Sequence, residues 1–231
     1  MLVGLRQVFM RFHACNLECI YCDTVQTSCP DYCLIEETPG RRDFSRVANP
    51  ITIERIVALL ERWQRGWPAI HHSISLTGGE PLLQVEILHD WLPILSGKLP
   101  IYLETNGILP QALASIIEFI DYIGMDIKLP STSGYTELWD SHREFLELAV
   151  RKNVFVKIVI KDGTEDWEII KACELIASID RKIPLVMQPI TLNDGVVGIS
   201  PLRALELQEI ACGHLAEVRI VPQTHKFLGQ L

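Results

Sequence analysis

The stretch that decides the fold is QVFMRFHACNLECIYCDT, residues 7–24. Its first six residues, Gln7–Phe12, are rich in apolar and aromatic side chains, a composition typical of a strand. The residues after them carry Cys15, Cys19 and Cys22 in a CxxxCxxC spacing. In a reducing compartment, clustered thiols indicate metal ligation and not disulfides. We therefore expect a metal-binding loop at the end of the first strand.

Further apolar and β-branched runs follow at intervals of a few tens of residues, with helical patterns between them. They are His72–Leu76, Ile101–Glu104, Tyr122–Asp126, Val154–Ile160, Pro184–Gln188 and Glu217–Val221. Regular alternation of strand and helix requires right-handed crossovers and a parallel sheet covered by helices. The sequence predicts one α/β domain over residues 1–231, built as a doubly wound sheet or as a barrel.

Capping residues and prolines mark where several helices begin. Thr52 precedes a helical pattern as its N-cap, and Pro110 and Pro201 occupy positions typical of a first helical turn. Two polar segments interrupt the repeat, residues 24–50 and 131–141. We expect both to be excursions near the mouth of the site, because long connections in compact domains are usually functional.

The charge balance excludes some classes of partner. The 231-residue chain carries 21 Lys and Arg against 29 Asp and Glu, a formal net charge of −8. Binding to nucleic acid by counterion release needs a basic surface, so no nucleic-acid partner is expected. No apolar run approaches the roughly 18 residues that cross a bilayer, and the start MLVGLRQVFM lacks a secretory signal. We expect a cytoplasmic protein with a small-molecule substrate and no membrane partner.

The cysteine count leaves two interpretations of the metal site. Structural zinc sites and electron-transfer clusters normally take four protein ligands, whereas three thiolates leave one metal position open for a small molecule. The alternative is a zinc site completed by Cys29 or Cys33, in a zinc-stabilised interaction module. Cys173 and Cys212 stand alone in helical patterns and are expected to be small buried hydrophobic residues.

Polar or glycine-rich segments also follow the other strands. Gly78 and Gly79 let the backbone approach a ligand and present its N–H groups, and Glu80 can accept from an amino group. Because the chemistry of both candidate folds gathers beyond the carboxyl ends of the strands, we expect one site there. The segments are TGGEP (77–81), ETNG (104–107), DIK (126–128), QPIT (188–191) and PQTHK (222–226).

The CxxxCxxC loop and TGGEP together resemble the radical S-adenosylmethionine (SAM) enzymes, and the resemblance covers essentially the whole chain. It implies a partial (βα)6-type radical SAM barrel with parallel strands and one insertion, residues 24–50, after the cluster loop. It also implies a 4Fe-4S cluster on Cys15, Cys19 and Cys22, whose open iron binds SAM and cleaves it to a radical. The SAM contacts that it implies are Gly78, Gly79, Glu80, Thr105, Asn106, Asp126, Ile127, Lys128 and Gln188.

Within that superfamily the chain is similar to the 7-carboxy-7-deazaguanine synthase family. The similarity rests on GLRQVFMRFHACNLECIYCDT (4–24), on TGGEP and on a chain end soon after PQTHKFLG. It implies a ring contraction of 6-carboxy-5,6,7,8-tetrahydropterin with loss of ammonia and regeneration of SAM, in 7-deazapurine biosynthesis of the queuosine or archaeosine type. Mg²⁺, a homodimer and a flavodoxin-type electron donor are implied by the same similarity.

The family similarity also implies contacts to the metal and the pterin. A neutral hydroxyl suits a hard cation, and a guanidinium fork suits a carboxylate. The matching residue for Mg²⁺ is Thr24. The matching residues for the substrate are Arg6, Thr77, His225 and the carboxylate of Leu231. The last two belong to a tail, residues 222–231, that is expected to cover the site. A segment resembling SIQGEG, which precedes the first strand in the family, has no match before Arg6. We expect that difference to affect the substrate more than the cluster or SAM.

Other radical SAM enzymes share these motifs, so a second interpretation stays open. An activase that makes a glycyl radical on a partner protein has a similar cysteine triplet and glycine-rich strand exit. It would need an open groove for a peptide loop, whereas the pterin interpretation predicts a site closed by the C-terminal tail. Cys29 and Cys33 have no role in either interpretation.

Overall fold

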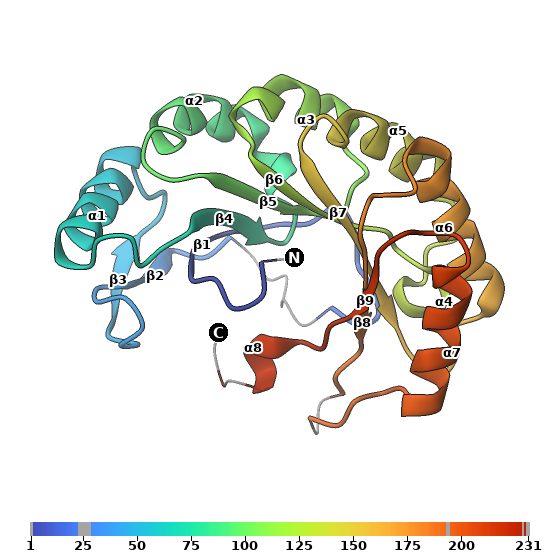
Figure 1. The fold of residues 1–231 in the computed structure, drawn as a ribbon. Helices are drawn as coiled ribbons and strands as arrows, with labels where there is room; N and C mark the ends of the chain where they lie inside the picture. The colour runs from blue at the N-terminus through green and yellow to red at the C-terminus, as the bar shows by residue number, and fades with distance from the viewer. Residues whose placement is uncertain (1, 23–28, 193–194, 228, 230–231) are drawn as a thin grey trace.

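The computed structural model describes residues 2–22, 29–192, 195–227 and 229. Its main element is a seven-stranded sheet in the order β1-β4-β5-β6-β7-β8-β9, with every neighbouring pair parallel. The sheet curves into an arc with helices on its outer side (Figure 1), which confirms the expected partial barrel. The strands are β1 (Gln7–Phe12), β4 (Ser73–Gly78), β5 (Ile101–Thr105), β6 (Tyr122–Asp126), β7 (Asn153–Ile160), β8 (Leu185–Pro189) and β9 (Val218–Ile220).

The helices that cover the arc are amphipathic. In α1, for example, Ile56, Leu60 and Trp63 are buried at i, i+4 and i+7, so one face packs on the sheet. Two short 3₁₀ turns, η1 (Pro81–Gln84) and η2 (Ile117–Phe119), complete the connections. The helices are α1 (Ile53–Gly66), α2 (Val85–Leu95), α3 (Pro110–Ile116), α4 (Pro130–Ser133), α5 (Trp139–Ala149), α6 (Asp166–Ile179), α7 (Pro201–Cys212) and α8 (Thr224–Phe227).

The predicted helix starts are confirmed, with one difference in capping. Pro110 and Pro201 are the first residues of α3 and α7, and the Ser200 hydroxyl accepts a hydrogen bond from the Arg203 N–H at 3.2 Å. Thr52 is the N-cap of α1, but its side chain makes no capping hydrogen bond. The Thr52 side chain instead bonds the Glu54 carboxylate in the first turn, which lowers the pKa of Glu54.

The insertion contains secondary structure that the sequence did not predict. β2 (Tyr32–Glu36) and β3 (Phe44–Ala48) form an antiparallel hairpin that is separate from the main sheet. Its loop is fixed to α1, because the Glu37 carbonyl accepts from Trp63 Nε1 at 2.9 Å. The second polar segment, residues 131–141, is helical at both ends, where α4 finishes and α5 begins.

The two isolated cysteines differ in environment. Cys173 is buried in α6 as predicted, and burial raises its pKa to about 12. The prediction for Cys212 is wrong, because this residue is exposed. Helix α7 buries Ala204, Leu207 and Ala211, so the next position points away from the sheet.

The two faces of the sheet have different compositions. The outer face and the helices share the main apolar core, whereas the inner face has a small cluster of Tyr102, Phe155 and Val186. Nearer the carboxyl ends of the strands, the inner face carries charged residues, among them Glu104 and Lys157. Because side chains alternate along a strand, a dry layer and a polar layer lie on opposite sides of one sheet.

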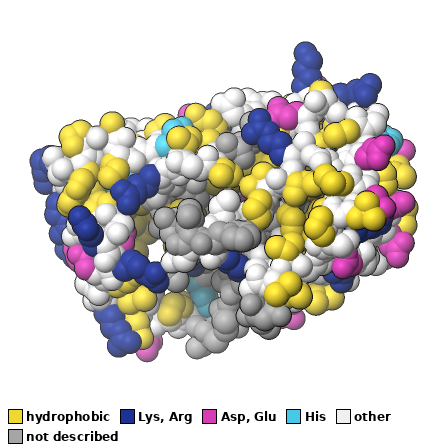
Figure 2. All heavy atoms as spheres, turned by 60° about the horizontal axis from the view of Figure 1, so that its bottom comes forward, with side chains coloured by type: hydrophobic (Ala, Val, Ile, Leu, Met, Phe, Trp, Pro, Cys, Tyr) yellow, Lys and Arg dark blue, Asp and Glu magenta, His cyan; other side chains and the backbone are white. Residues whose placement is uncertain are grey.

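The concave side of the arc faces the chain ends. The N-terminal segment and α8 lie there (Figure 1), and Arg42 in the hairpin loop donates from Nη1 to the Gly229 carbonyl at 3.0 Å. On this side, basic side chains gather over α1 and the β2–β3 hairpin (Figure 2). None of the helices in the described part of the chain has the length and apolar composition to span a membrane.

Candidate functional site

The loop after β1 is held against the exits of other strands. The Asn106 side chain, just after β5, donates to Asn16 Oδ1 at 2.8 Å. On the other side, the Glu18 N–H donates to the Tyr135 hydroxyl at 2.8 Å. The Ile20 N–H bonds the carbonyl of Ser133, the last residue of α4, at 3.3 Å. The cysteine loop is thus fixed at the carboxyl edge of the sheet, where the sequence predicts the site.

The three predicted cluster ligands lie on this loop as cysteines outside any disulfide. Cys15 and Cys19 are half-buried, and Cys22 is exposed. The Leu17 N–H points at the Cys15 sulfur at 3.4 Å, the kind of contact that stabilises a thiolate. Burial raises the pKa of Cys19, the Lys128 cation opposes this shift, and Asp126 and the two other thiols add to it. The protein alone therefore favours the neutral Cys19 thiol, and a bound metal would favour the thiolate.

The donor set fits an iron–sulfur cluster better than a single ion. Within the described ranges, no three His, Cys, Asp or Glu side chains are arranged to hold one metal ion. A 4Fe-4S cluster takes each thiolate on a different iron, so its sulfur ligands need not converge on one point. Soft thiolates and the absence of carboxylate donors from this triplet also suit iron–sulfur ligation.

The glycine pair packs against the exit of β1. Gly78 has φ +125°, and a Cβ there would overlap the carbonyl oxygen of Phe12. The Gly79 N–H donates to the same carbonyl at 3.1 Å, and the Glu80 N–H donates to Ala14 at 2.8 Å. The expectation that this turn presents its N–H groups to a ligand is therefore wrong for the N–H groups of Gly79 and Glu80. These two groups instead join TGGEP to the cluster loop.

Glu80 joins two strand exits. Its buried carboxylate accepts from the Leu82 N–H at 3.0 Å, the Thr105 hydroxyl at 2.9 Å and the Asn106 N–H at 2.7 Å. Burial raises the pKa of Glu80, although these hydrogen bonds oppose the shift. The carboxylate orders the exits of β4 and β5, and its contact with a SAM amino group stays a prediction.

Asp126 and Lys128 form the most polar part of the site. Lys128 Nζ lies 2.6 Å from Asp126 Oδ2 and 2.8 Å from the Tyr21 hydroxyl. Burial opposes ionisation of Asp126, but the neighbouring Lys128 and Lys157 cations hold its pKa below the ordinary value. Asp126 Oδ1 is buried and has no hydrogen-bond partner among the described residues. An acceptor of this kind fits the hydroxyl or amino group of a bound small molecule.

The remaining predicted contacts, Ile127 and Gln188 to SAM and Thr77 to the substrate, lie in different environments. The Ile127 side chain is buried in the main core and its N–H bonds the Lys157 carbonyl at 2.9 Å, so its own carbonyl is the group left for a ligand. Gln188 is half-buried on β8, opposite Val159. Thr77 is buried on β4 and donates to Glu104 Oε2 at 3.0 Å.

Two charged residues of this network, Glu104 and Lys157, are not among the residues predicted from the sequence. Lys157 Nζ lies 3.1 Å from Glu104 Oε1 and 3.6 Å from Asp126 Oδ2. The Lys157 cation lowers the pKa of Glu104. A usable signal existed, because Lys157 is the one charged residue in the strand NVFVKIVI, and a lone lysine within an apolar strand usually has a partner.

His142 was also missed, and it connects two strand exits. It is fully buried in α5; its Nε2 accepts from the Lys128 N–H at 3.1 Å, and its Nδ1 lies 3.1 Å from the Gly107 carbonyl. These partners require a neutral ring with the proton on Nδ1. Burial lowers the pKa of His142 to about 4.

We expect the substitution His142→Gln to reduce the pH dependence of stability. The neutral ring is favoured in the folded state, so wild-type stability is greatest above pH 6.5 and falls as the pH approaches about 4. The shift of the His142 pKa from 6.5 to about 4 corresponds to about 3 kcal/mol in the free energy of unfolding. Urea unfolding from pH 7.5 to 4.5 should give a shallower curve for the variant, with the exposed His89→Gln as control. Parallel curves for His142→Gln and wild type would contradict this role.

Some predicted residues are not brought to this edge. Arg6 precedes β1, and its guanidinium packs against Gly40 in the hairpin loop. Six strand residues, roughly 20 Å, separate it from the cysteine loop. Thr24 and Leu231 lie outside the described residues, and the structure describes the backbone of His225, in α8, but not its side chain.

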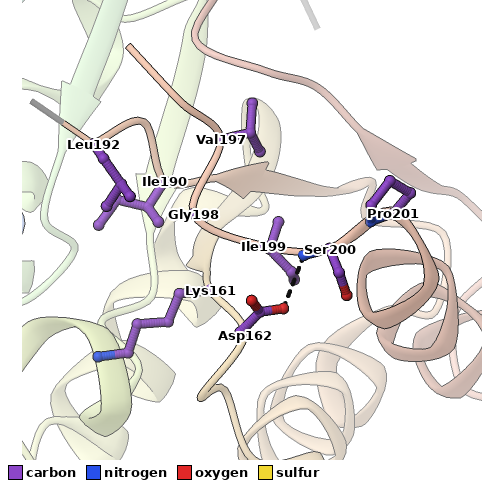
Figure 3. Close-up of a pocket in the computed structure, with 9 residues that line it drawn as sticks. All are labelled: Lys161, Asp162, Ile190, Leu192, Val197, Gly198, Ile199, Ser200 and Pro201. Carbon is purple, nitrogen blue, oxygen red and sulfur yellow. Dashed lines mark hydrogen bonds between the residues drawn. The ribbon is translucent and has the colours of Figure 1, made fainter. Parts of the chain in front are cut away.

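A separate hollow lies beside the exits of β7 and β8. It has a volume of about 520 Å³, and its apolar lining includes Ile190, Leu192 and Val197. The Ser200 N–H donates to Asp162 at 2.8 Å at its edge (Figure 3). Its lining includes Ile190 of the QPIT segment but none of the individual residues predicted as contacts.

Comparison with known proteins agrees with this arrangement. Residues 10–176 match the model of the radical SAM superfamily. A 7-carboxy-7-deazaguanine synthase of Geobacter sulfurreducens is 59% identical over 231 residues, which cover 100% of this chain and 92% of the relative. The chain belongs to the 7-carboxy-7-deazaguanine synthase family. A family member from Archaeoglobus fulgidus is 32% identical, with 98% of this chain and 91% of the relative covered.

Solved structures show the same fold at low sequence identity. SuiB of Streptococcus suis bound to S-adenosylmethionine aligns with a TM-score of 0.62 and 13% identity, over 95% of this chain and 47% of the other. A radical SAM methyltransferase from Sphaerobacter thermophilus aligns with a TM-score of 0.57 and 16% identity, over 77% and 58%. Membership of the 7-carboxy-7-deazaguanine synthase family decides against the activase and the zinc module as descriptions of this chain.

Proposed function

We propose that the protein converts 6-carboxy-5,6,7,8-tetrahydropterin to 7-carboxy-7-deazaguanine with loss of ammonia. The observation that carries the proposal is the 59% identity with a synthase of that name over the whole chain. The gathering of the cysteine loop, TGGEP and the Asp126–Lys128 pair at one sheet edge supports it.

The proposal is tested by product formation. Reconstituted protein is incubated anaerobically with SAM, a reductant, Mg²⁺ and the carboxypterin, and the deazaguanine acid is sought by mass spectrometry. We expect product only when every component is present, with SAM recovered after turnover. Irreversible SAM cleavage without this product would overturn the substrate assignment and leave the radical SAM assignment intact.

In the proposed site, Cys15, Cys19 and Cys22 hold a 4Fe-4S cluster. With SAM bound, the cluster supplies the one-electron chemistry that starts the reaction. The contribution of the chain is placement: Asp126 offers a free carboxylate oxygen, and Lys128 holds that carboxylate toward the loop. The Asp126 and Lys128 side chains are only 10% exposed, and such shielding from water protects a reactive radical from side reactions.

Substrate placement involves Mg²⁺ and an arginine. We keep Thr24 as the proposed Mg²⁺ ligand and Thr77 as a substrate contact. The family similarity assigns the substrate carboxylate to Arg6, whereas the structure favours Arg11, which is the register partner of Thr77 on β1. Register partners in a parallel pair face the same side of the sheet, so Arg11 and Thr77 both face the concave side.

The two arginines can be separated by substitution. Arg11→Ala should raise the KM for the carboxypterin about tenfold or more, because a charge-assisted hydrogen bond contributes about 1.5–3 kcal/mol. Arg6→Ala should leave the KM within about twofold, since Arg6 lies at the other end of β1. The reverse ranking in steady-state assays would show that Arg6 reaches the substrate.

The C-terminal tail and the assembly are also part of the proposal. Residues 222–231 are proposed to cover the pterin with His225 and the Leu231 carboxylate, and the position of α8 on the concave side supports this (Figure 1). A homodimer and a flavodoxin-type reductant are proposed from the family similarity, and a cytoplasmic location is proposed from the sequence. Sedimentation velocity of the cluster-loaded protein tests the dimer.

A further inference from the structure

We propose that Lys157 is a positioning residue for SAM, which holds the carboxylates of Glu104 and Asp126 in the orientation that the cofactor needs. The inference rests on the proposed function, because it takes Asp126 as a SAM contact. It adds a role for a residue in the middle of β7, on a strand to which no cofactor contact is otherwise assigned.

The arrangement around Asp126 supports this role for Lys157. Lys157 Nζ lies 3.6 Å from Oδ2, and Lys128 Nζ lies 2.6 Å from the same oxygen. Both cations therefore bind one side of the carboxylate. Oδ1 is left buried with no hydrogen-bond partner in the part of the chain that the structure describes. Two lysines on Oδ2 fix the carboxylate plane and keep Oδ1 available for a ligand.

The charge balance on the inner face of the sheet also supports this role. Lys157 also pairs with Glu104 at 3.1 Å, and Glu104 in turn accepts from the Thr77 hydroxyl at 3.0 Å. The carboxylates of Glu104 and Asp126 are thus matched by two ammonium groups. Removing one ammonium leaves an uncompensated negative charge in a poorly solvated space, which also faces Tyr21 and the Cys19 thiol.

The strand β7 is held in the sheet by contacts other than the Lys157 ammonium group. Val156 and Ile158, the neighbours of Lys157 on β7, are fully buried in the core on the other face of the sheet. β7 pairs with β6 and β8 along its length through backbone hydrogen bonds. A methionine at position 157 retains most of the aliphatic volume, so the sheet should form without the ammonium group.

The test measures SAM affinity of cluster-loaded protein by anaerobic equilibrium dialysis at pH 6, 7 and 8. Lys157→Met should bind SAM about tenfold more weakly or worse. Its loss should grow toward pH 6, because carboxylates without their cation take up protons at higher pH. Lys157→Arg should recover part of the affinity, and the surface variant Lys152→Met should bind like wild type at every pH.

The outcomes separate this inference from the site assignment. Asp126→Asn is measured beside the lysine variants. If it weakens binding and Lys157→Met binds SAM like wild type with the same pH profile, the role of Lys157 is overturned. If Asp126→Asn also binds normally, the assignment of Asp126 fails and this inference fails with it. Should Lys157→Met not fold, the charge-balanced Lys157→Met/Glu104→Gln replaces it, and wild-type affinity in that variant overturns the inference.

Discussion

Cys19→Ala should yield folded protein without the iron–sulfur chromophore and without detectable product. The thiol is one of three on the loop after β1. In the proposed site each thiolate binds one iron and the fourth iron is open, so two thiolates are too few to hold the cluster. The change removes only a half-buried sulfur, so the sheet and its apolar core should persist. Iron analysis, visible absorption and the product assay on anaerobically purified protein measure the effect.

The matched controls are Cys29→Ala and Cys33→Ala. Both thiols lie in or beside the β2–β3 hairpin, and neither has a role in the proposed site. We expect both variants to keep full iron content and activity. If the wild-type protein contained zinc in place of iron and either variant lost that zinc, the result would instead support the four-ligand zinc site.

Gly78→Ala should have the largest effect on stability. The residue has φ +125°, which an alanine rarely adopts, and its Cβ would overlap the Phe12 backbone. The turn cannot relax easily, because the neighbouring Gly79 and Glu80 N–H groups bond the carbonyls of Phe12 and Ala14. Backbone strain and overpacking together should cost about 3 kcal/mol or more, measured by urea denaturation.

Gly66→Ala provides the comparison for that variant. Gly66 ends α1, and an added Cβ there meets no atom within 4 Å. Its stability should stay within about 0.5 kcal/mol of wild type or rise slightly. Equal stabilities for Gly78→Ala and Gly66→Ala would mean that the TGGEP turn is not constrained by the exit of β1.

The strands are predictable because their core-facing side chains give short, largely apolar runs with polar residues at their ends. β1 and β6 have the predicted bounds, and the other strands of the main sheet differ by one or two residues. The β2–β3 hairpin escapes the same approach because its short strands are half-exposed and interrupted by polar residues such as Glu36, Ser45 and Arg46. Its fold depends on contacts with α1, which no local pattern reveals.

The site is predictable to the extent that each motif follows a strand. The sequence places Asp126 and Lys128 at one edge because both lie at the end of β6. It cannot show that Asp126 shares its Oδ2 with Lys157, since that contact depends on the register of β6 with β7. His142 carries no local signal, because a histidine on the buried face of a helix looks like any other core position.

The central claim is that three thiolates hold an iron–sulfur cluster with one iron open to SAM. Its most direct test is iron and sulfide analysis of anaerobically reconstituted protein, followed by electron paramagnetic resonance of the reduced protein with and without SAM. The account predicts about four irons per chain and a spectrum that changes when SAM is added. One zinc per chain, or a cluster spectrum that SAM leaves unchanged, would contradict it.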